Sequence, residues 1–315
     1  MTDTLALRAF VDELVGSGVA DAIVCPGSRS TPLALALRAH PGIRVRVLLD
    51  ERSAGFFALV LAKAARRPVA VLTTSGTAAA NLLPAVVEAS LGRVPLVVLT
   101  ADRPLELRDR GAPQAIDQVR LFGSHAKWFS EVPLLDGEDV TRRHVRAVAS
   151  RAVATAVAGP AGAVHLNLPF REPLVPHGPL GPLPDEPSTR VVAGPRLLDE
   201  SATRDLARRL AGVDHGLIVA GPQDDPALPA ALARLAAALE WPVMADPLSL
   251  ARCGPHDRSR VVARGDQLLR PGPWREGHLP ELVLRFGATP TSKPLLTLVE
   301  ERRPAVIVVD GDAGW

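Results

Sequence analysis

Short apolar runs alternate with helix-length amphipathic segments along most of the chain. In the first half the apolar, β-branched runs predict five buried strands, at 22–25, 43–49, 69–73, 95–99 and 163–168. Apolar residues three and four positions apart predict helices that begin at 31, span 51–66 and 76–91, and lie near 140–157. Helices interleaved with buried strands predict a parallel sheet that is covered by helices on both faces.

A proline-rich segment interrupts this pattern. Its prolines are Pro169, Pro173, Pro176, Pro179, Pro182, Pro184 and Pro187. Proline removes a backbone donor and fixes φ, so neither a helix nor a sheet strand is expected to run through the segment. We therefore predict an N-terminal domain at 1–170, a linker at 171–195 and a second domain at 196–315.

The second domain repeats the alternation. Strands are predicted at 217–220, 243–245, 282–286 and 305–309, and helices at 226–239 and 293–302. A doubly wound domain would continue beyond the last of these strands, so we expect the second α/β domain to be incomplete. The predicted fold class is thus α/β, with a doubly wound parallel-sheet domain followed by an incomplete central α/β domain.

Composition narrows the classes of function. Of the 315 residues 47% are apolar and 22% are charged, and the formal net charge is +2. This balance argues against a disordered chain and against a nucleic-acid partner. No apolar run approaches the roughly 20 residues of a membrane span, and the chain opens into an amphipathic helix without a signal-like segment. We expect a cytoplasmic protein with no membrane span.

Familiar ligand motifs are missing from the sequence, but three segments just after predicted strands stand out. Gly16 and Gly18 begin a dinucleotide-like pattern that fails at Asp21. The three segments are PGSRSTP at 26–32, DERSAG at 50–55 and TSGTAAAN at 74–81. Ligands in open α/β sheets bind beyond the carboxyl ends of the strands, so these segments are candidate binding turns.

Local chemistry leaves a structural alternative open for each segment. Arg29 suits a bidentate grip on a carboxylate, but Ser30 or Thr31 would equally cap the following helix. The acids at 50 and 51 commonly stabilise a helix N-terminus. Small residues at 75–80 admit a planar ligand, or else they serve tight packing between helix and sheet.

The order and spacing of the segments are more specific than any one of them. Together with LTADRP at 99–104, GAPQAI at 111–116 and FGATPTSK at 286–293, they resemble the pyrimidine-binding domain of thiamine-diphosphate enzymes. More narrowly, the chain resembles the family of 2-succinyl-5-enolpyruvyl-6-hydroxy-3-cyclohexene-1-carboxylate synthases, from the first helix to Phe170 and again from Phe286. The resemblance implies a pyrimidine-binding domain, a truncated central domain and no diphosphate-binding domain.

The resemblance also implies a reaction, a transferase step of menaquinone biosynthesis. 2-Oxoglutarate is decarboxylated on thiamine diphosphate, and the succinyl carbanion undergoes 1,4-addition to isochorismate. The family works as a homodimer or tetramer with Mg²⁺ or Mn²⁺. Glu51 occupies the position of the glutamate that hydrogen-bonds the aminopyrimidine ring; a raised pKa would require apolar surroundings, which Leu48, Leu49, Phe56 and Phe57 could supply.

Further site residues follow from the same resemblance. The positions that match isochorismate binding are Ser28, Arg29, Arg103, Gln114 and Lys293. The positions expected at the cofactor are Glu51, Ser75, Gly76, Thr77 and Asn81.

The chain departs from the family in its metal motif. The Gly-Asp-Gly followed by asparagine that holds Mg²⁺ on the diphosphate is missing, and residues 310–312 read Asp-Gly-Asp. We therefore assign no metal ligand and expect the chain alone to be nearly inactive. Two alternatives remain: one subunit of a split carboligase, and a non-catalytic ligand-binding remnant.

Overall fold

The computed structural model describes residues 4–175, 188–192, 194 and 196–311. The chain forms two compact units, residues 1–193 and 194–315. Five of the prolines of the expected linker (176, 179, 182, 184 and 187), and Asp312, lie outside the described residues. Within the described ranges no helix has the length and apolar character needed to cross a membrane.

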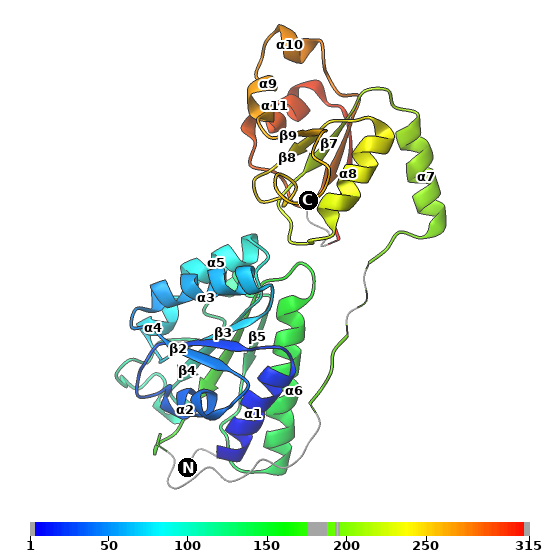
Figure 1. Cartoon of the computed structure of the whole chain (residues 1–315). Coiled ribbons are helices and arrows are strands. Elements are labelled where there is room, and N and C mark those ends of the chain that lie inside the picture. Colours follow the sequence, from blue (N-terminus) through cyan, green and yellow to red (C-terminus); the bar gives the residue numbers. More distant parts are fainter. Residues whose placement is uncertain (1–3, 176–187, 193, 195, 312–315) are drawn as a thin grey trace. The chain divides into compact units, whose positions relative to one another are not determined.

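The first unit is built on a six-stranded, wholly parallel sheet (Figure 1). Its strand order is β2-β1-β3-β4-β6-β5. The strands are β1 (Asp21–Val24), β2 (Arg44–Val47), β3 (Val69–Thr73), β4 (Leu96–Asp102), β5 (Trp128–Glu131) and β6 (Ala163–Pro169). The predicted parallel sheet is confirmed.

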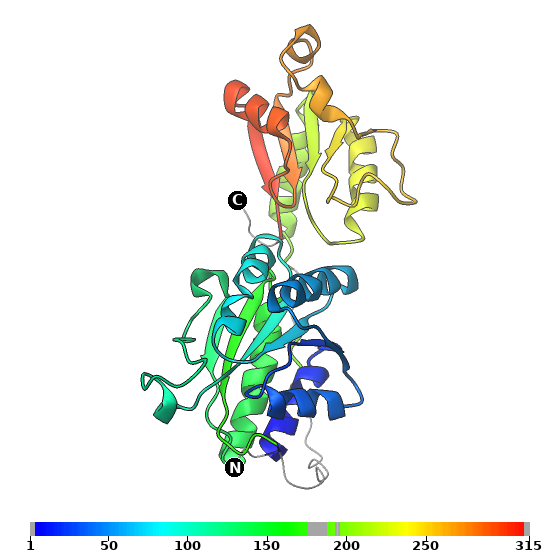
Figure 2. The same ribbon diagram turned by 90° about the vertical axis from the view of Figure 1, so that its left-hand side faces the viewer.

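Helices cover both faces of this sheet (Figures 1 and 2). One face carries α1 (Thr4–Gly16), α2 (Thr31–Ala39) and α6 (Asp139–Val157), and the other carries α3 (Glu51–Ala65) and α5 (Leu83–Leu91). Successive strand residues alternate between the two cores: Ala22 and Val24 belong to the first, Ile23 and Cys25 to the second. Burial on both sides explains why the central strands read as continuous apolar runs.

Two parts of the first unit differ from the prediction. The single helix expected over 76–91 is broken into α4 (Thr77–Ala80) and α5, because Pro84 has no backbone N–H and occupies the first turn of a new helix. The edge strand β5 was not predicted, since all four of its residues are half-buried and give no apolar alternation. Two 3₁₀ turns, η1 (Leu105–Leu107) and η2 (Gly123–His125), lie in the polar stretch before it.

The second unit has a five-stranded parallel sheet in the order β11-β10-β7-β8-β9. Its strands are β7 (Gly216–Ala220), β8 (Val243–Ala245), β9 (Val261–Val262), β10 (Leu282–Phe286) and β11 (Ala305–Val309). Its helices are α7 (Glu200–Ala211), α8 (Leu228–Leu239), α9 (Gly265–Leu268), α10 (Pro273–Glu276) and α11 (Lys293–Arg302). The four predicted strands and α8 and α11 are present; β9, α7, α9 and α10 were not predicted.

Candidate active site at the carboxyl edge of the first sheet

The strand order of the first sheet reverses between β1 and β3, and the turns that follow these strands meet there. The amide of Cys25 donates to the Leu72 carbonyl at 2.8 Å. A Cβ on Gly27 would lie 2.5 Å from Cβ of Thr74, so only glycine lets the two turns approach this closely. Two of the three candidate turns are therefore neighbours at the switch point, where open α/β sheets bind ligands.

Arg29 is held at this switch point with unused hydrogen-bonding capacity. It is 7% exposed, and its Nη1 donates to the Phe170 carbonyl at 2.8 Å. Its Nη2 lies 3.4 Å from the exposed Glu172 carboxylate. Its Nε is buried and finds no acceptor among the described residues. A buried donor without a partner is costly, which indicates that this position is built to receive one.

The capping interpretation of this turn is wrong. The Ser30 and Thr31 hydroxyls both donate back to the Gly27 carbonyl, at 3.0 and 3.2 Å, and neither side chain caps α2. These bonds fix the turn that carries Arg29. Ser28, which directly follows Gly27, is exposed.

The sequence left open whether the acids at 50 and 51 stabilise the helix N-terminus or serve a ligand, and in the structure Asp50 and Glu51 differ in this respect. Asp50 caps α3, because its Oδ1 accepts from the Ser53 amide at 2.7 Å, and the same bond lowers the pKa of Asp50. Glu51 is the first residue of α3 and is half-buried, and no hydrogen bond or ion pair of its carboxylate is found within the described ranges. Burial raises the pKa of Cys25, at the end of β1, to about 12, with the Glu51 charge as the next cause. Glu51 therefore lies at the same edge of the sheet with its carboxylate available.

The apolar enclosure expected around Glu51 is incomplete within one chain. Leu48 is half-buried and packs on the core below α3, but Leu49 is 82% exposed and Phe57 is 42% exposed. Phe56 is half-buried and lines a shallow hollow on α3 together with Phe57.

The Gly76 turn is closely packed against the segment that carries Gln114. Gly76 has φ +81°, and a Cβ there would lie 3.0 Å from the Gln114 carbonyl oxygen. Gln114 itself has φ +54° and is exposed. Next to the glycine, Ser75 is buried and Thr77 is exposed at the start of α4. Asn81 is exposed at the other end of this short helix.

Arg103 links the turns after β3 and β4. Its guanidinium donates to the Ser75 hydroxyl and, at 2.7 Å, to the Pro113 carbonyl. Partial burial lowers the pKa of Arg103, and the positive charge of Arg29 lowers it further. The positive charges of Arg29 and Arg103 therefore act on each other at this edge of the sheet.

A buried polar network behind these turns was missed at the level of sequence. The Gln118 Oε1 accepts from the Gly76 amide at 2.8 Å, and its Nε2 donates to Asn167 Oδ1 at 2.9 Å. Asn167 Nδ2 donates to Asp102 Oδ2 at 2.8 Å. Asp102 Oδ1 accepts from the Arg103 amide at 2.7 Å. A continuous chain of hydrogen bonds therefore joins the Gly76 turn to the backbone of Arg103.

His165 belongs to the same network in a defined tautomer. The Thr100 hydroxyl donates to Asn167 Oδ1 at 2.8 Å, so its oxygen accepts from His165 Nε2, also at 2.8 Å. The His165 Nδ1 is then an unprotonated nitrogen, and it has no partner within the described residues. Burial lowers the pKa of His165 to about 3, which keeps the ring neutral. Polar residues inside otherwise apolar strands were the signal in the sequence for a buried polar cluster, but they did not indicate which residues it joins.

Asp102 is the charged member of the network. Burial raises its pKa, against the opposing effect of the bond from Asn167 and the nearby charge of Arg108. Arg108 Nη2 lies 2.9 Å from Asp102 Oδ2 and 2.6 Å from Glu131 Oε1. The network is thereby tied to the edge strand β5.

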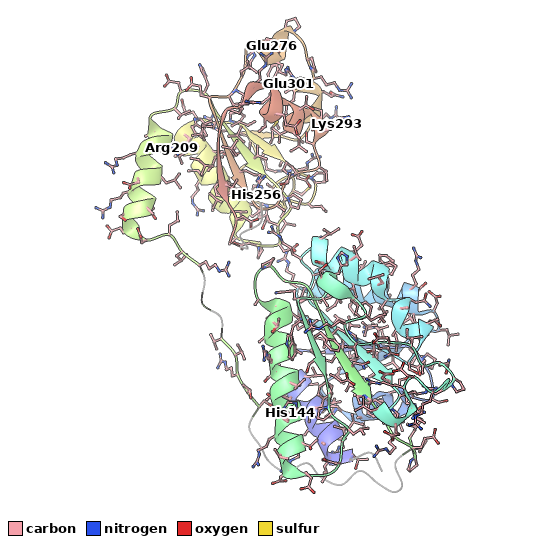
Figure 3. The ribbon with its side chains drawn as sticks, turned by 180° about the vertical axis from the view of Figure 1, so that it is seen from behind. His144, Arg209, His256, Glu276, Lys293 and Glu301 are labelled. Carbon is pink, nitrogen blue, oxygen red and sulfur yellow. The ribbon has the colours of Figure 1, made fainter. Side chains whose placement is uncertain are left out.

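Lys293 is the one predicted site residue that belongs to the second unit. It is the first residue of α11 and is exposed (Figure 3). The preceding Ser292 caps the helix, accepting from the Leu295 amide at 3.3 Å. All other predicted site residues lie in the first unit.

Comparison with known proteins identifies the domain family of the first unit. Residues 6–121 match the family described as thiamine pyrophosphate enzyme, N-terminal TPP binding domain. The chain therefore carries the N-terminal, pyrimidine-binding domain of a thiamine-diphosphate enzyme.

Relatives extend the comparison along the whole chain. The chain is 50% identical to 2-succinyl-5-enolpyruvyl-6-hydroxy-3-cyclohexene-1-carboxylate synthase of Geobacillus kaustophilus, covering 100% of this chain and 56% of that protein. It is 52% identical to the Chloroflexus aurantiacus synthase, over 98% of this chain and 53% of the relative. It is 46% identical to the Listeria innocua synthase, over 100% of this chain and 55% of that relative. The chain is a homologue of the N-terminal part of these synthases, and it spans about half the length of the curated relatives it matches.

Proposed function

We propose that this chain supplies the part of the active site that binds the pyrimidine ring, and part of the substrate-binding site, of a thiamine-diphosphate-dependent transferase. The proposed reaction is decarboxylation of 2-oxoglutarate and 1,4-addition of the succinyl carbanion to isochorismate, and its product is the compound that the name of the relatives prints. The proposal extends to a place in menaquinone biosynthesis, in the cytoplasm.

The observation that carries the proposal is the pair Arg29 and Arg103. The positive charge of Arg29 lowers the pKa of Arg103, and the buried Nε of Arg29 lacks an acceptor among the described residues. A carboxylate placed between two such groups would relieve their repulsion and accept charge-assisted hydrogen bonds. Isochorismate and 2-oxoglutarate are both dicarboxylates, so substrates of this class suit the site. We assign Ser28, Gln114 and Lys293 to the same substrate-binding site, because their positions match the sequence pattern of the synthase family.

The residues at this edge also suit the aminopyrimidine end of thiamine diphosphate. When bound, the cofactor supplies the carbanion equivalent that attacks the keto carbon. It also holds the electron pair that stays behind when CO₂ leaves. We propose that Glu51, whose carboxylate has no partner in the described structure, hydrogen-bonds the pyrimidine ring. The backbone of Ser75, Gly76 and Thr77 would then lie against the ring, with Asn81 at the far end of α4. The Mg²⁺ and diphosphate ligands would come from outside this chain.

A second subunit would complete the surroundings of Glu51. Leu49, Phe57 and Val60 are 82%, 42% and 64% exposed. Phe57 and Val60 line a hollow of about 520 Å³ on α3. Covering these side chains would desolvate the Glu51 carboxyl and favour its protonated form, which is the form that donates to a ring nitrogen. We therefore propose a homodimer or tetramer as the working assembly.

Reconstitution tests the proposed reaction. The chain is mixed with a separately expressed C-terminal part of the Geobacillus kaustophilus synthase, covering what lies beyond the matched region. Size-exclusion chromatography establishes that a complex forms, and product is measured with 2-oxoglutarate, isochorismate, thiamine diphosphate and Mg²⁺. We expect product from the complex and a KM for isochorismate raised at least about tenfold in Arg103→Gln. A complex that forms and binds thiamine diphosphate but gives no product would contradict the proposed reaction.

A further inference from the structure

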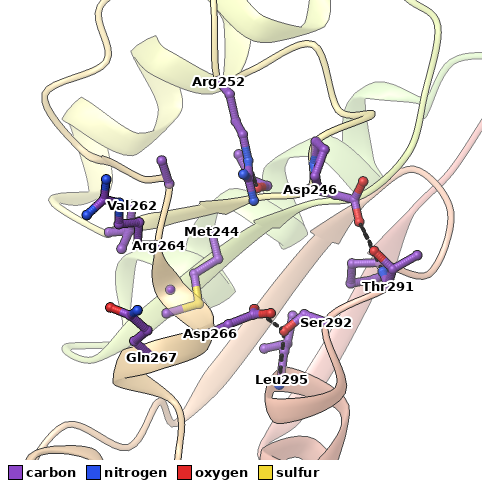
Figure 4. A pocket seen from close by; sticks show the side chains of 15 residues that line it. Met244, Asp246, Arg252, Val262, Arg264, Asp266, Gln267, Thr291, Ser292 and Leu295 are labelled. Carbon is purple, nitrogen blue, oxygen red and sulfur yellow. Dashed lines mark hydrogen bonds between the residues drawn. The ribbon is translucent and has the colours of Figure 1, made fainter.

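A second pocket lies at the carboxyl edge of the second sheet. It has a volume of about 380 Å³ and is formed by the ends of β8 and β9, the start of α9 and the segment before α11 (Figure 4). This volume is within the range of small-molecule sites, and the carboxyl edge is where open α/β sheets bind ligands.

The position of the pocket follows from how the switch point of this sheet is filled. The order of strands reverses between β7 and β10. There Gly221 donates to the Phe286 carbonyl at 2.8 Å, and Ala288 donates to the Pro222 carbonyl at 3.0 Å. A Cβ on Gly221 would lie 1.8 Å from the Ala288 oxygen, so backbone occupies the crevice itself. The open space is found beside it, over β8.

The carboxylates that line this pocket are already used by the protein. Asp246 is 6% exposed and accepts three hydrogen bonds, from the Leu248 amide at 2.9 Å and from the Thr291 amide and hydroxyl at 3.0 Å each. Asp266 accepts from the Ser292 hydroxyl at 2.5 Å. Asp266 is exposed, so water screens the charge of its carboxylate.

The arginines that line the pocket are, by contrast, available. Arg252 is oriented by one bond, from its Nε to the Ala245 carbonyl at 2.6 Å. In the described structure no acceptor is found for its terminal nitrogens or for the guanidinium of Arg264. In Figure 4 the Arg252 side chain runs from the loop after β8 toward the middle of the pocket, and Arg264 lies at another part of the rim. Met244, Val262 and Leu295 supply an apolar wall.

The geometry points to a binding site for a small organic oxyanion with an apolar body. The terminal nitrogens of Arg252 and the Arg264 guanidinium hold the anionic group, because guanidinium forms charge-assisted, often bidentate bonds with carboxylates and phosphates. The apolar wall receives the rest of the molecule. None of the residues that line this pocket is assigned to the reaction proposed above, although Lys293 directly follows Ser292 at its rim.

Ligand titration of the ¹⁵N-labelled chain tests this inference. Benzoate and phenyl phosphate share an apolar body and differ in the anionic group, and benzyl alcohol is the neutral comparison. We expect the two anions to shift the amide signals of residues 244–246 and 262–267 saturably, and benzyl alcohol to leave them unchanged. The tighter of the two anions identifies the preferred group as carboxylate or phosphate.

Single variants make the test specific. Arg264→Gln and Arg252→Gln should each weaken binding about tenfold. Arg234→Gln, which removes an exposed arginine of α8 outside the pocket, should leave binding unchanged. Arg264 is exposed, so its replacement is not expected to disturb folding, and thermal melting checks this for each variant. Absence of saturable binding by both anions, or equal affinity in Arg264→Gln and Arg234→Gln, would overturn the inference.

Discussion

Asp50 caps helix α3 by accepting a hydrogen bond from the Ser53 amide at 2.7 Å. Glu51 is adjacent in sequence but takes no part in this cap, and its carboxylate has no partner in the described structure. Asp50 alone therefore caps the helix at this strand–helix junction, and the carboxylate of Glu51 is left available for a ligand.

This division of roles predicts opposite behaviour for two neighbouring variants. Asp50→Ala should lower the free energy of unfolding, because it removes the hydrogen bond that caps the helix. Glu51→Gln should change the free energy of unfolding by less than about 0.5 kcal/mol, because only a favourable charge near the helix N-terminus is lost. Urea denaturation of the two variants checks this, and equal destabilisation would show that Glu51 also has a structural role.

Asp21 is predicted to stabilise the first unit in a pH-dependent way. Burial opposes its ionisation, but hydrogen bonds from Arg46, Arg44 and Arg67, at 2.6, 3.1 and 2.5 Å, outweigh burial and lower the pKa. The stabilisation is therefore complete above the unfolded pKa of about 3.9 and is lost as the pH falls through the lower folded value. Asp21→Asn should cost about 2 kcal/mol at pH 7. Thermal melts should show this difference closing below about pH 4; a constant difference would contradict the assignment.

His165 should remain neutral across the physiological range. Its folded pKa of about 3 lies below the unfolded value of 6.5, so the unfolded chain takes up the proton first. Stability should therefore decline as the pH falls below about 6.5 and continue to decline toward pH 3. NMR of the ring nitrogens should show the Nε2–H tautomer and no titration between pH 8 and 5, with exposed His144 as the reference signal. A titration of His165 in that interval would contradict the network.

Gly76 and Gly111 form a matched pair for separating backbone strain from close packing. Their φ angles are +81° and +70°, but a Cβ on Gly76 would lie 3.0 Å from the Gln114 oxygen, whereas a Cβ on Gly111 would have nothing within 4 Å. Gly111→Ala should cost about 1 kcal/mol from strain alone. Gly76→Ala should cost roughly 2–3 kcal/mol, because the Gln114 segment must also move. Equal losses in urea denaturation would mean that this contact does not matter.

The sequence was informative where one physical constraint acted on consecutive residues. The central strands of both sheets were predicted because burial on two faces makes nearly every residue apolar, as in β3 and β7. The edge strand β5 and the helix α7 were missed, since β5 is half-buried throughout and Leu210 is the only buried residue of α7.

The candidate site was predictable in the same uneven way. The turns that carry Arg29, Glu51 and Gly76 directly follow predicted strands, so their common edge followed from a parallel sheet. The hydrogen bonds that join Gln118 to Gly76 and Asn167 connect residues 42 and 49 positions apart. Side-chain contacts over such separations leave no local spacing in the sequence, and only the folded chain reveals them.

The most direct test of the central proposal concerns Glu51 and the cofactor. In the reconstituted complex, exchange of the C2 proton of thiamine diphosphate with deuterated solvent is measured by quenched-flow NMR, for the wild-type chain and for Glu51→Gln. We predict that the variant still binds thiamine diphosphate but exchanges the proton at least about a hundredfold more slowly, the usual size of a lost general acid–base contribution. An unchanged exchange rate at full cofactor occupancy would contradict the role proposed for Glu51.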